Sequence, residues 1–560
     1  MRTTETAIET PAYAERLRER VRTRRARAPS VADFWCGQSL SERFDATVGA
    51  RPEAAMLVED ARRFCFREID QESQRLAAGM AREGVGPGSA LAYQLPNWHE
   101  AAVIFLAATR LGAHLVPLVS TLGVPELRAI FRETSPRLHF VNGENAPRVE
   151  EHRQWLLKEQ PSTTAVTVRG TWSGKGSYES LVSTAAAAPA PAVDPQAAAA
   201  IIYTSGSTAA PKGALHIHET LTAEIDSLQQ AHDLTPKDRV LMPSPLGHIS
   251  GVIHGILTPA LLGTSAVLQP RWDPKVALDA IADFGVTYMI GAPVFLQEIL
   301  AQTDLAEHDL HTLRLFSCGG APVAPPLLAD AREKLPHLTA KRVYGSSEFP
   351  TISTTDATDA TERGHDSEGK PLRGIALRIT DGSGNELPPG VEGEVCAQGP
   401  ECFLGYVDPR LDNEAFDQAG YFRTGDLGIV DADGYLRISG RLKEIIVRKG
   451  ENISAREIEE QILASCPEFR EVAVVALPDP RRGEIACACG RAAAGMAPMT
   501  LDAVAERLQD DGFNARKLPE RLEFFDDFPR LPSGKVDKRR LSEILQDSGP
   551  NALAGTRSRG

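Results

Sequence analysis

The feature that most constrains this chain is a short polar loop that directly follows an apolar run. Residues 197–202 form the apolar run and predict a buried strand. The loop after it has the sequence Tyr203-Thr204-Ser205-Gly206-Ser207-Thr208-Ala209-Ala210-Pro211-Lys212-Gly213. Its small and hydroxylated residues allow backbone N–H groups and hydroxyls to surround an anion, and Lys212 adds a positive charge. The loop predicts a phosphate-binding site at a strand end, although a solvated surface turn would have the same composition.

Segments with strand and helix patterns alternate between residues 54 and 344. A hairpin is predicted at 54–58 and 63–66, followed by a helix at 68–83 and a strand at 90–94. Later strands are predicted at 240–242, 287–290, 313–317 and 341–344. This alternation predicts an α/β fold tending towards a doubly wound sheet, with strand ends that converge on one place. Shorter spacing and frequent turns from 375 to 434 predict an antiparallel β region beside this core.

Length and charge exclude several classes of protein. A chain of 560 residues exceeds the roughly 250–300 residues at which single cores stop growing, so we expect more than one domain. The formal net charge of −14 argues against a nucleic-acid partner, because no basic excess is available to replace phosphate counterions. The eight cysteines match no common zinc spacing and predict reduced, mostly buried thiols.

Two stretches bear on membranes and targeting. The longest apolar stretch, 101–119, is broken by Arg110 and His114, and no signal peptide begins the chain, so no membrane span is predicted. The arginine-rich stretch 16–27 is interrupted on its N-terminal side by Glu15 and Glu19, which favours an exposed helix over a targeting signal. We therefore expect a cytoplasmic protein.

Four further motifs follow the phosphate loop in order. They are Tyr344-Gly345-Ser346-Ser347-Glu348, Tyr421-Phe422-Arg423-Thr424-Gly425-Asp426-Leu427-Gly428, Gly440-Arg441-Leu442-Lys443-Glu444-Ile445-Ile446 and Leu531-Pro532-Ser533-Gly534-Lys535. Each alone fits an ordinary turn, but together with the phosphate loop they resemble the adenylate-forming superfamily of acyl-CoA synthetases, carrier-protein adenylation domains and luciferases. The resemblance covers about residues 45–545. It implies ATP, Mg²⁺ and coenzyme A as cofactors.

The resemblance also implies a role for individual residues. Tyr344 would stack on adenine, Ser347 would contact phosphate, and Glu348 would hold Mg²⁺, a cation that prefers oxygen ligands. Asp426 would accept hydrogen bonds from both ribose hydroxyls, and Arg441 would reach ribose or phosphate. The other nucleotide-binding residues implied are Thr204, Ser205, Gly206, Ser207, Thr208, Lys212, Gly320, Ala321 and Gly345.

The chemistry implied by the resemblance depends on residues in three further places. Lys535 would be the catalytic lysine, acting with Glu348 and with His248 in the acyl pocket, although His248 also fits a residue that only shapes its loop. Lys443 would be the hinge residue, and Gly450 would lie beside the tunnel for the pantetheine arm of coenzyme A.

The expected division of the chain has four parts. They are a tail and helix at 1–44, an AMP-binding domain of α/β layers with an associated β region at 45–440, a small mobile α+β lid domain at 441–545 and a flexible tail at 546–560.

The implied reaction joins a small carboxylic acid to a thiol at the expense of ATP. The acid is activated as acyl-AMP with release of pyrophosphate, and the acyl group passes to coenzyme A; loading of a phosphopantetheinyl carrier protein is the alternative. The loop around His248 lacks an aspartate that would hold an ammonium group, which favours an acid without an α-amino group.

The sequence also bears on two other classes of protein. Ala209 stands where the family usually has glycine, so a nucleotide sensor without catalysis stays open. A serine hydrolase is disfavoured, because the serine of Gly247-His248-Ile249-Ser250-Gly251 falls one place too late for the nucleophile motif.

Overall fold

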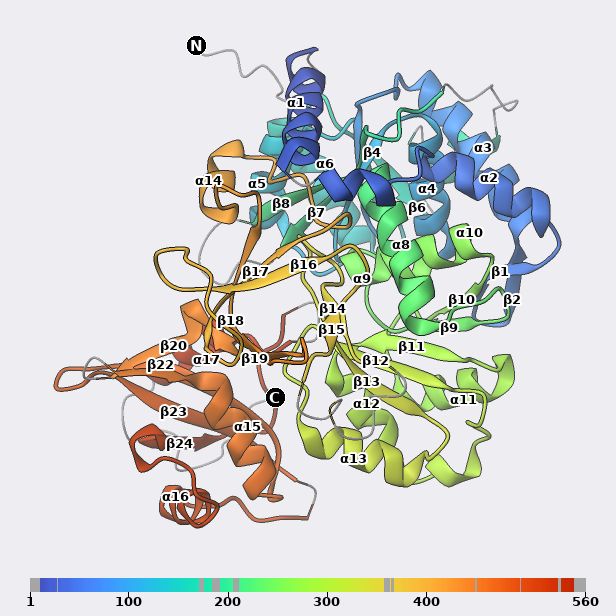
Figure 1. Cartoon of the computed structure of the whole chain (residues 1–560). Coiled ribbons are helices and arrows are strands. Elements are labelled where there is room, and N and C mark those ends of the chain that lie inside the picture. The colour runs from blue at the N-terminus through green and yellow to red at the C-terminus, as the bar shows by residue number, and fades with distance from the viewer. Residues whose placement is uncertain are drawn as a thin grey trace.

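The structure, a computed structural model, describes residues 11–27, 29–170, 176–183, 192–204, 211–356, 363, 367–448, 451–493, 495–531 and 535–547. Residues 205–210 of the phosphate loop, Gly450, residues 532–534 and the expected tail beyond 547 lie outside these ranges. Figure 1 shows a larger N-terminal part, coloured blue through yellow to light orange, and a smaller C-terminal part, coloured dark orange to red, that packs against one end of it.

The largest sheet has nine strands in the order β15-β14-β13-β12-β11-β9-β10-β1-β2. Its strands are β1 (Ala55–Glu59), β2 (Arg62–Cys65), β9 (Arg239–Met242), β10 (Ser265–Leu268), β11 (Tyr288–Gly291), β12 (Leu315–Gly319), β13 (Thr339–Tyr344), β14 (Ser353–Thr354) and β15 (Lys370–Pro371). Parallel pairing runs from β13 through β12, β11, β9 and β10 to β1. The carboxyl ends of these strands therefore lie along one edge of the sheet, where α/β proteins place their ligands.

A second sheet has six strands in the order β6-β5-β3-β4-β7-β8. They are β3 (Ala90–Gln94), β4 (His114–Pro117), β5 (Leu138–Asn142), β6 (Thr164–Val168), β7 (Ala198–Thr204) and β8 (Lys212–Ile217). The alternation along the sequence is thus divided between two sheets, not one. The first hairpin joins the other sheet because β1 pairs with β10, with Leu57 opposite Ala266, and local periodicity does not encode such a distant register.

Helices cover both sheets. In the N-terminal part they are α2 (Leu40–Ala50), α3 (Phe66–Arg82), α4 (His99–Arg110), α5 (Val124–Thr134), α6 (Ala146–Glu159), α7 (Tyr178–Ser183), α8 (His218–His232), α9 (Ile249–Gly251), a π-helical turn (Val252–Leu257), α10 (Thr258–Leu262), α11 (Pro274–Phe284), α12 (Pro293–Leu300), α13 (Pro325–Lys334) and α14 (Asp412–Ala415). The helix α4 is buried along its whole length because it contacts β4 of one sheet and β1 of the other. Within the described ranges, no helix has both the length and the apolar character needed to cross a membrane.

An antiparallel sheet of four strands follows in the chain, as the sequence predicts. Its strands are β16 (Ala376–Thr380), β17 (Gly393–Gln398), β18 (Phe422–Val430) and β19 (Leu436–Arg441). Antiparallel pairing brings residues of β18 and β19 face to face at the end nearest the C-terminal part. This sheet therefore ends where the two parts of the molecule meet (Figure 1).

The C-terminal part has its own sheet and core. Its elements are β20 (Ile445–Arg448), β21 (Glu451–Ser454), β22 (Phe469–Asp479), β23 (Gly483–Ala492), β24 (Arg521–Phe524), α15 (Ala455–Ser465), α16 (Leu501–Asp510) and α17 (Lys538–Asp547). Residues of α15 and α16 pack in one apolar cluster and those of α17 in another, so helices flank the sheet. The fold class predicted from the sequence, a large α/β part with a small α+β part, is confirmed. The cysteines are free and mostly buried.

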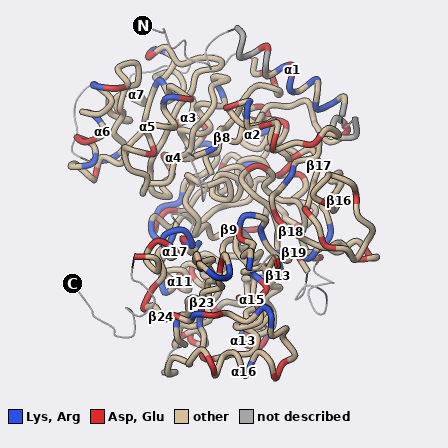
Figure 2. The backbone as a smooth tube through the Cα atoms, turned by 90° about the vertical axis from the view of Figure 1, so that its left-hand side faces the viewer, with Lys and Arg blue, Asp and Glu red and all other residues tan. Residues whose placement is uncertain are grey.

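The first helix, α1 (Pro11–Arg27), differs from the prediction of an exposed helix. Leu17 and Val21 are buried in a core cluster, whereas Arg18 and Arg22 are exposed. Figure 2 shows positive and negative residues mixed along the helix. The prediction is therefore wrong for one face of α1, because the many charged residues hide a narrow apolar stripe with a spacing of four.

Candidate active site

Asp426 lies at the centre of the candidate site, on β18 directly opposite Arg441 of β19. Its carboxylate is buried, and each oxygen has a partner: the Tyr344 hydroxyl donates to Oδ2 at 2.7 Å and Arg441 Nε donates to Oδ1 at 2.8 Å. The Asp426 charge raises the pKa of Arg441, and burial followed by the same charge raises the pKa of Tyr344. We call these three residues the Asp426 platform. Tyr344 comes from the nine-stranded sheet, and Asp426 and Arg441 come from the antiparallel four-stranded sheet.

The turn after β13 carries Glu348. It begins at Gly345, where a Cβ would lie 1.9 Å from Pro350 O, so a side chain has no room. Ser346 Oγ accepts a hydrogen bond from the Glu348 backbone N–H at 3.2 Å. Glu348 Oε1 accepts one from the Tyr406 hydroxyl at 2.7 Å, whereas no described residue donates to Oε2. The turn therefore presents a carboxylate oxygen that suits a hard cation such as Mg²⁺.

The strands β7 and β8 flank the phosphate loop. Thr204 ends β7, Lys212 begins β8, and the two residues are opposite each other in the ladder. Lys212 Nζ lies 5.2 Å from the centroid of the Tyr406 ring. His216 Nε2, also on β8, lies 2.8 Å from Ser347 O. Burial lowers the pKa of His216 to about 4, so a neutral ring donates this hydrogen bond at neutral pH. The bond connects the pair of strands β7 and β8, which we call the phosphate hairpin, to the turn that carries Glu348.

Lys535 reaches the same place from the C-terminal part. A Cβ built on Gly320, just after β12, would lie 3.5 Å from Lys535 Cε and 3.8 Å from Nζ, so the tip of the lysine lies against this strand end. Gly320 has a φ of +77°, a left-handed conformation that favours glycine. Desolvation of the ammonium, followed by the Arg441 charge, lowers the pKa of Lys535 to about 8 against the opposite effect of Asp426 and Glu348.

His248 lies directly before α9 and faces the same region. Burial, followed by the Lys535 charge, lowers the pKa of His248 to about 4, so its imidazole is neutral at neutral pH. Ala321 follows Gly320 in the turn after β12, whereas Lys443 is exposed on a short 3₁₀ turn, Leu442–Glu444. The structure therefore gathers the predicted strand-end residues and leaves Lys443 in the connection between the two parts.

Sequence analysis missed two residues that the structure places beside this site. Tyr406 holds Glu348, but it lies in a loop with no motif, and only the fold brings it there. Lys538 Nζ lies 2.6 Å from Glu444 Oε2 and 2.8 Å from Glu459 Oε1. Burial alone would lower the pKa of Lys538, but the two carboxylates, Glu459 foremost, raise it above its usual value. The one signal for Lys538 in the sequence is its separation of three residues from Lys535.

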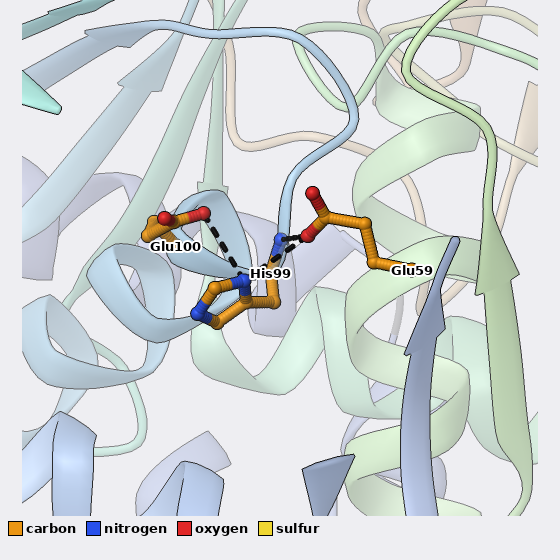
Figure 3. A group of neighbouring side chains, drawn as sticks. All are labelled: Glu59, His99 and Glu100. Atoms are coloured by element: carbon orange, nitrogen blue, oxygen red, sulfur yellow. Dashed lines mark hydrogen bonds and ion pairs between the residues drawn. The ribbon is translucent and has the colours of Figure 1, made fainter. Parts of the chain in front are cut away.

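A second group of ligating side chains lies elsewhere in the N-terminal part. Figure 3 shows His99 Nδ1 between Glu59 and Glu100, 3.0 Å and 3.1 Å from a carboxylate oxygen of each. All three residues are buried, a donor set that would suit a metal ion. Arg169 already pairs with both carboxylates, however, at 2.6 Å from Glu59 and 2.6 Å from Glu100. We therefore interpret this group as a buried ion-pair cluster that joins β1 to α4.

Comparisons with known proteins identify the family to which the chain is similar. Residues 44–407 match the family model of the AMP-binding enzymes, and residues 457–535 match that of the AMP-binding enzyme C-terminal domain. A medium-chain fatty-acid–CoA ligase of Escherichia coli (strain K12) is 30% identical over 528 residues, 91% of each chain. An indoleacetate–CoA ligase of Aromatoleum aromaticum is 32% identical over 510 residues, 90% of this chain and 98% of the relative.

A solved structure extends the agreement to three dimensions. ATP-bound MatB from Rhodopseudomonas palustris superposes with a TM-score of 0.82 at 27% identity, over 91% of this chain and 99% of that one. The match spans both parts of the molecule. The chain therefore belongs to the family of AMP-binding enzymes, as the resemblance of its loops to adenylate-forming ligases predicts.

Proposed function

We propose that the protein is an ATP-dependent carboxylate–CoA ligase that forms an acyl-AMP intermediate. The observation that carries this proposal is the position of Lys535, whose tip lies against Gly320 within the electrostatic reach of Asp426 and Glu348. An ammonium group at this strand edge lies where a carboxylate and the α-phosphate of a bound nucleotide would approach each other. The relatives that act as CoA ligases support the choice of acceptor.

In the first step a carboxylate oxygen of the acid attacks the α-phosphorus of ATP. The new oxygen–phosphorus bond forms as the bond from this phosphorus to the pyrophosphate oxygen breaks. Both reactants are anions, so stabilisation of charge decides the rate. We assign Lys535 to the acid carboxylate and the α-phosphate, Lys212 to the pyrophosphate portion, and Glu348 to a Mg²⁺ ion, which neutralises phosphate charge when bound.

The nucleotide itself is assigned to the Asp426 platform. Tyr344 stacks on adenine, Asp426 accepts from the ribose hydroxyls, and Arg441 reaches ribose or phosphate. Thr204, Ser347 and the loop residues 205–208 contact the phosphates, with Gly320, Ala321 and Gly345 lining the approach.

In the second step the thiol of coenzyme A attacks the carbonyl carbon of the acyl-AMP. A sulfur–carbon bond forms, the bond from the carbonyl carbon to the AMP oxygen breaks, and the thiol proton passes to solvent. We assign this step to a second orientation of the domain at 441–545, reached by rotation about Lys443, with Gly450 beside the pantetheine arm. The domain at 45–440 stays fixed in this scheme.

The acid is assigned to a pocket that includes His248. Its imidazole is neutral at neutral pH because burial lowers its pKa to about 4, so it offers a hydrogen bond without a charge. The stretch 243–251 contains no aspartate that would hold an ammonium group. We therefore propose a carboxylic acid without an α-amino group.

A pyrophosphate-release assay over aliphatic, alicyclic and aromatic acids tests the proposal. Release that requires ATP and an acid, followed by thioester formation only when coenzyme A is present, is the expected result. Acyl-AMP that accumulates with coenzyme A but is consumed by a phosphopantetheinyl carrier protein would assign the chain to carrier loading. ATP binding without pyrophosphate release for any acid would contradict the proposal and favour a nucleotide sensor.

A further inference from the structure

The helix α1 lies outside the region that the family models match, yet it docks behind Glu348. The match to the AMP-binding enzymes begins at residue 44, whereas α1 ends at Arg27. Arg20 and Arg24 lie one helical turn apart on the face of α1 that meets residues 399–412. The helix therefore adds contacts to the candidate site that the matched family region does not supply.

Arg20 holds the backbone of Tyr406, both directly and through Asp412. Its Nη1 donates to Tyr406 O at 2.9 Å, and its Nη2 lies 3.0 Å from Asp412 Oδ2. Asp412 Oδ1 in turn accepts the Tyr406 backbone N–H at 2.8 Å. Arg24 donates to the carbonyl of Phe403, three residues earlier, at 2.5 Å. Both polar groups of the Tyr406 backbone are thus fixed by a network that begins on α1.

Tyr406 carries this constraint into the candidate site. Its side chain is buried, its hydroxyl donates to Glu348 Oε1 at 2.7 Å, and its ring lies 5.2 Å from Lys212 Nζ. The hydrogen bond to Oε1 fixes the orientation of the Glu348 carboxylate and leaves Oε2 available to bind a cation. The same tyrosine therefore contacts both the proposed metal ligand and the lysine of the phosphate hairpin.

We propose that α1 is a brace for the metal site: Arg20 and Arg24 position Tyr406, and Tyr406 positions the Glu348 carboxylate. This proposal rests on the proposed function, in which Glu348 holds Mg²⁺. A carboxylate with one oxygen held and the other without a donor among the described residues fits a cation that takes one or two carboxylates together with phosphate oxygens. Arg20, Arg24 and Tyr406 are positioning residues and touch no reacting atom.

The chain offers a matched control on the same helix. Arg22 pairs with Glu19 at 2.7 Å and with Glu15 at 2.9 Å, and Arg18 lies 3.6 Å from Glu15, so these ion pairs stay within α1 itself. The double variants R20A/R24A and R18A/R22A remove the same charge from the same helix. The net charge of α1 therefore changes equally in both, whereas only R20A/R24A loses contacts to residues outside the helix.

The experiment measures binding of Mn²⁺, as a probe for Mg²⁺, to the full chain saturated with α,β-methylene-ATP, by electron paramagnetic resonance. Partners that orient a metal-binding side chain typically change metal affinity by about 10- to 100-fold. We expect R20A/R24A to weaken Mn²⁺ binding about tenfold, Tyr406→Phe to weaken it at least as much, and R18A/R22A to leave it unchanged. Thermal melts of all variants accompany the titrations.

The outcomes separate this proposal from the proposed function. Equal Mn²⁺ affinity in R20A/R24A and R18A/R22A overturns the role of α1, and unchanged affinity in Tyr406→Phe overturns the role of Tyr406. If R20A/R24A unfolds at a lower temperature than the wild type, Tyr406→Phe tests whether Tyr406 positions Glu348, because this variant retains α1 and the aromatic ring. A wild-type chain that binds Mn²⁺ with the nucleotide but releases no pyrophosphate with any acid would refute the ligase activity and leave the brace standing.

Discussion

Two lysines of the C-terminal part lie three residues apart in opposite environments. Lys538 Nζ lies between two carboxylates, 2.6 Å from Glu444 and 2.8 Å from Glu459. Lys535 forms no ion pair with any described residue, and desolvation followed by the Arg441 charge lowers its pKa to about 8. The two lysines therefore have different roles: one forms structural ion pairs, and the other is free to interact with a ligand. Lys538 fixes the start of α17, and Lys535 keeps its charge available for a ligand.

The largest expected effect follows from removing the lysine without an ion pair. Lys535→Ala should lower adenylate formation by about 10³-fold, because Lys535 is the residue assigned to both the carboxylate and the α-phosphate and offsets the repulsion between them. The measurement is acid-dependent pyrophosphate release in a single turnover. Transfer from presynthesised acyl-AMP to coenzyme A should be retained, since that step uses the other domain orientation. Equal loss of both steps with an unchanged melt would contradict the division of roles.

Removing the anchored lysine should act on stability first. Lys538→Met leaves the buried carboxylate of Glu459 without its ion-pair partner and should lower the free energy of unfolding of the C-terminal part by about 3 kcal/mol. Arg539→Met is the control, since its pair with Glu543 is exposed and should contribute less than about 1 kcal/mol. Urea unfolding followed by fluorescence and circular dichroism measures both. Similar midpoints for the two variants would show that Lys538 is not an anchor.

The smallest expected effect is a pH dependence that belongs to Lys535. Its pKa is lowered to about 8, so the ammonium is present below pH 8 and is lost as the pH rises through that value. The kcat/KM of adenylate formation, which reports the free enzyme, should therefore be about tenfold lower at pH 9 than at pH 7. Lys535→Arg keeps its charge over this range and should remove the fall. A decline that persists in Lys535→Arg would assign the titration to another group.

Much of the fold follows from local patterns in the sequence. The hairpin of β1 and β2, the helix α3 and the strand β3 lie where apolar spacing and turn residues place them. The separation into two sheets was not predictable, because it depends on the pairing of β1 with β10, far along the chain. Docking of α1 was missed for a related reason, since the partners of Arg20 lie beyond residue 400.

The candidate site also contains some residues that could be predicted from the sequence and others that could not. Gly320 and Tyr344 could be placed together because β12 and β13 are parallel neighbours whose carboxyl ends share one edge. Asp426 and Arg441 are likewise brought together by a short antiparallel connection. Tyr406 has no such signal, since its hydrogen bond to Glu348 depends on packing between segments that no local pattern relates.

The anchoring of Lys538 also limits where the proposed rotation of the C-terminal part could take place. Arg441 is fastened to the N-terminal part by Asp426, and Glu444 is fastened to the C-terminal part by Lys538. Only Leu442 and Lys443 lie between these two ion pairs, and both are exposed. A swing of the C-terminal part that preserves both pairs must therefore be absorbed by the backbone torsions of two residues. The direction of the swing is then set by the three peptide units that join Arg441 to Glu444, and a bulky or rigid residue at position 442 or 443 would change it.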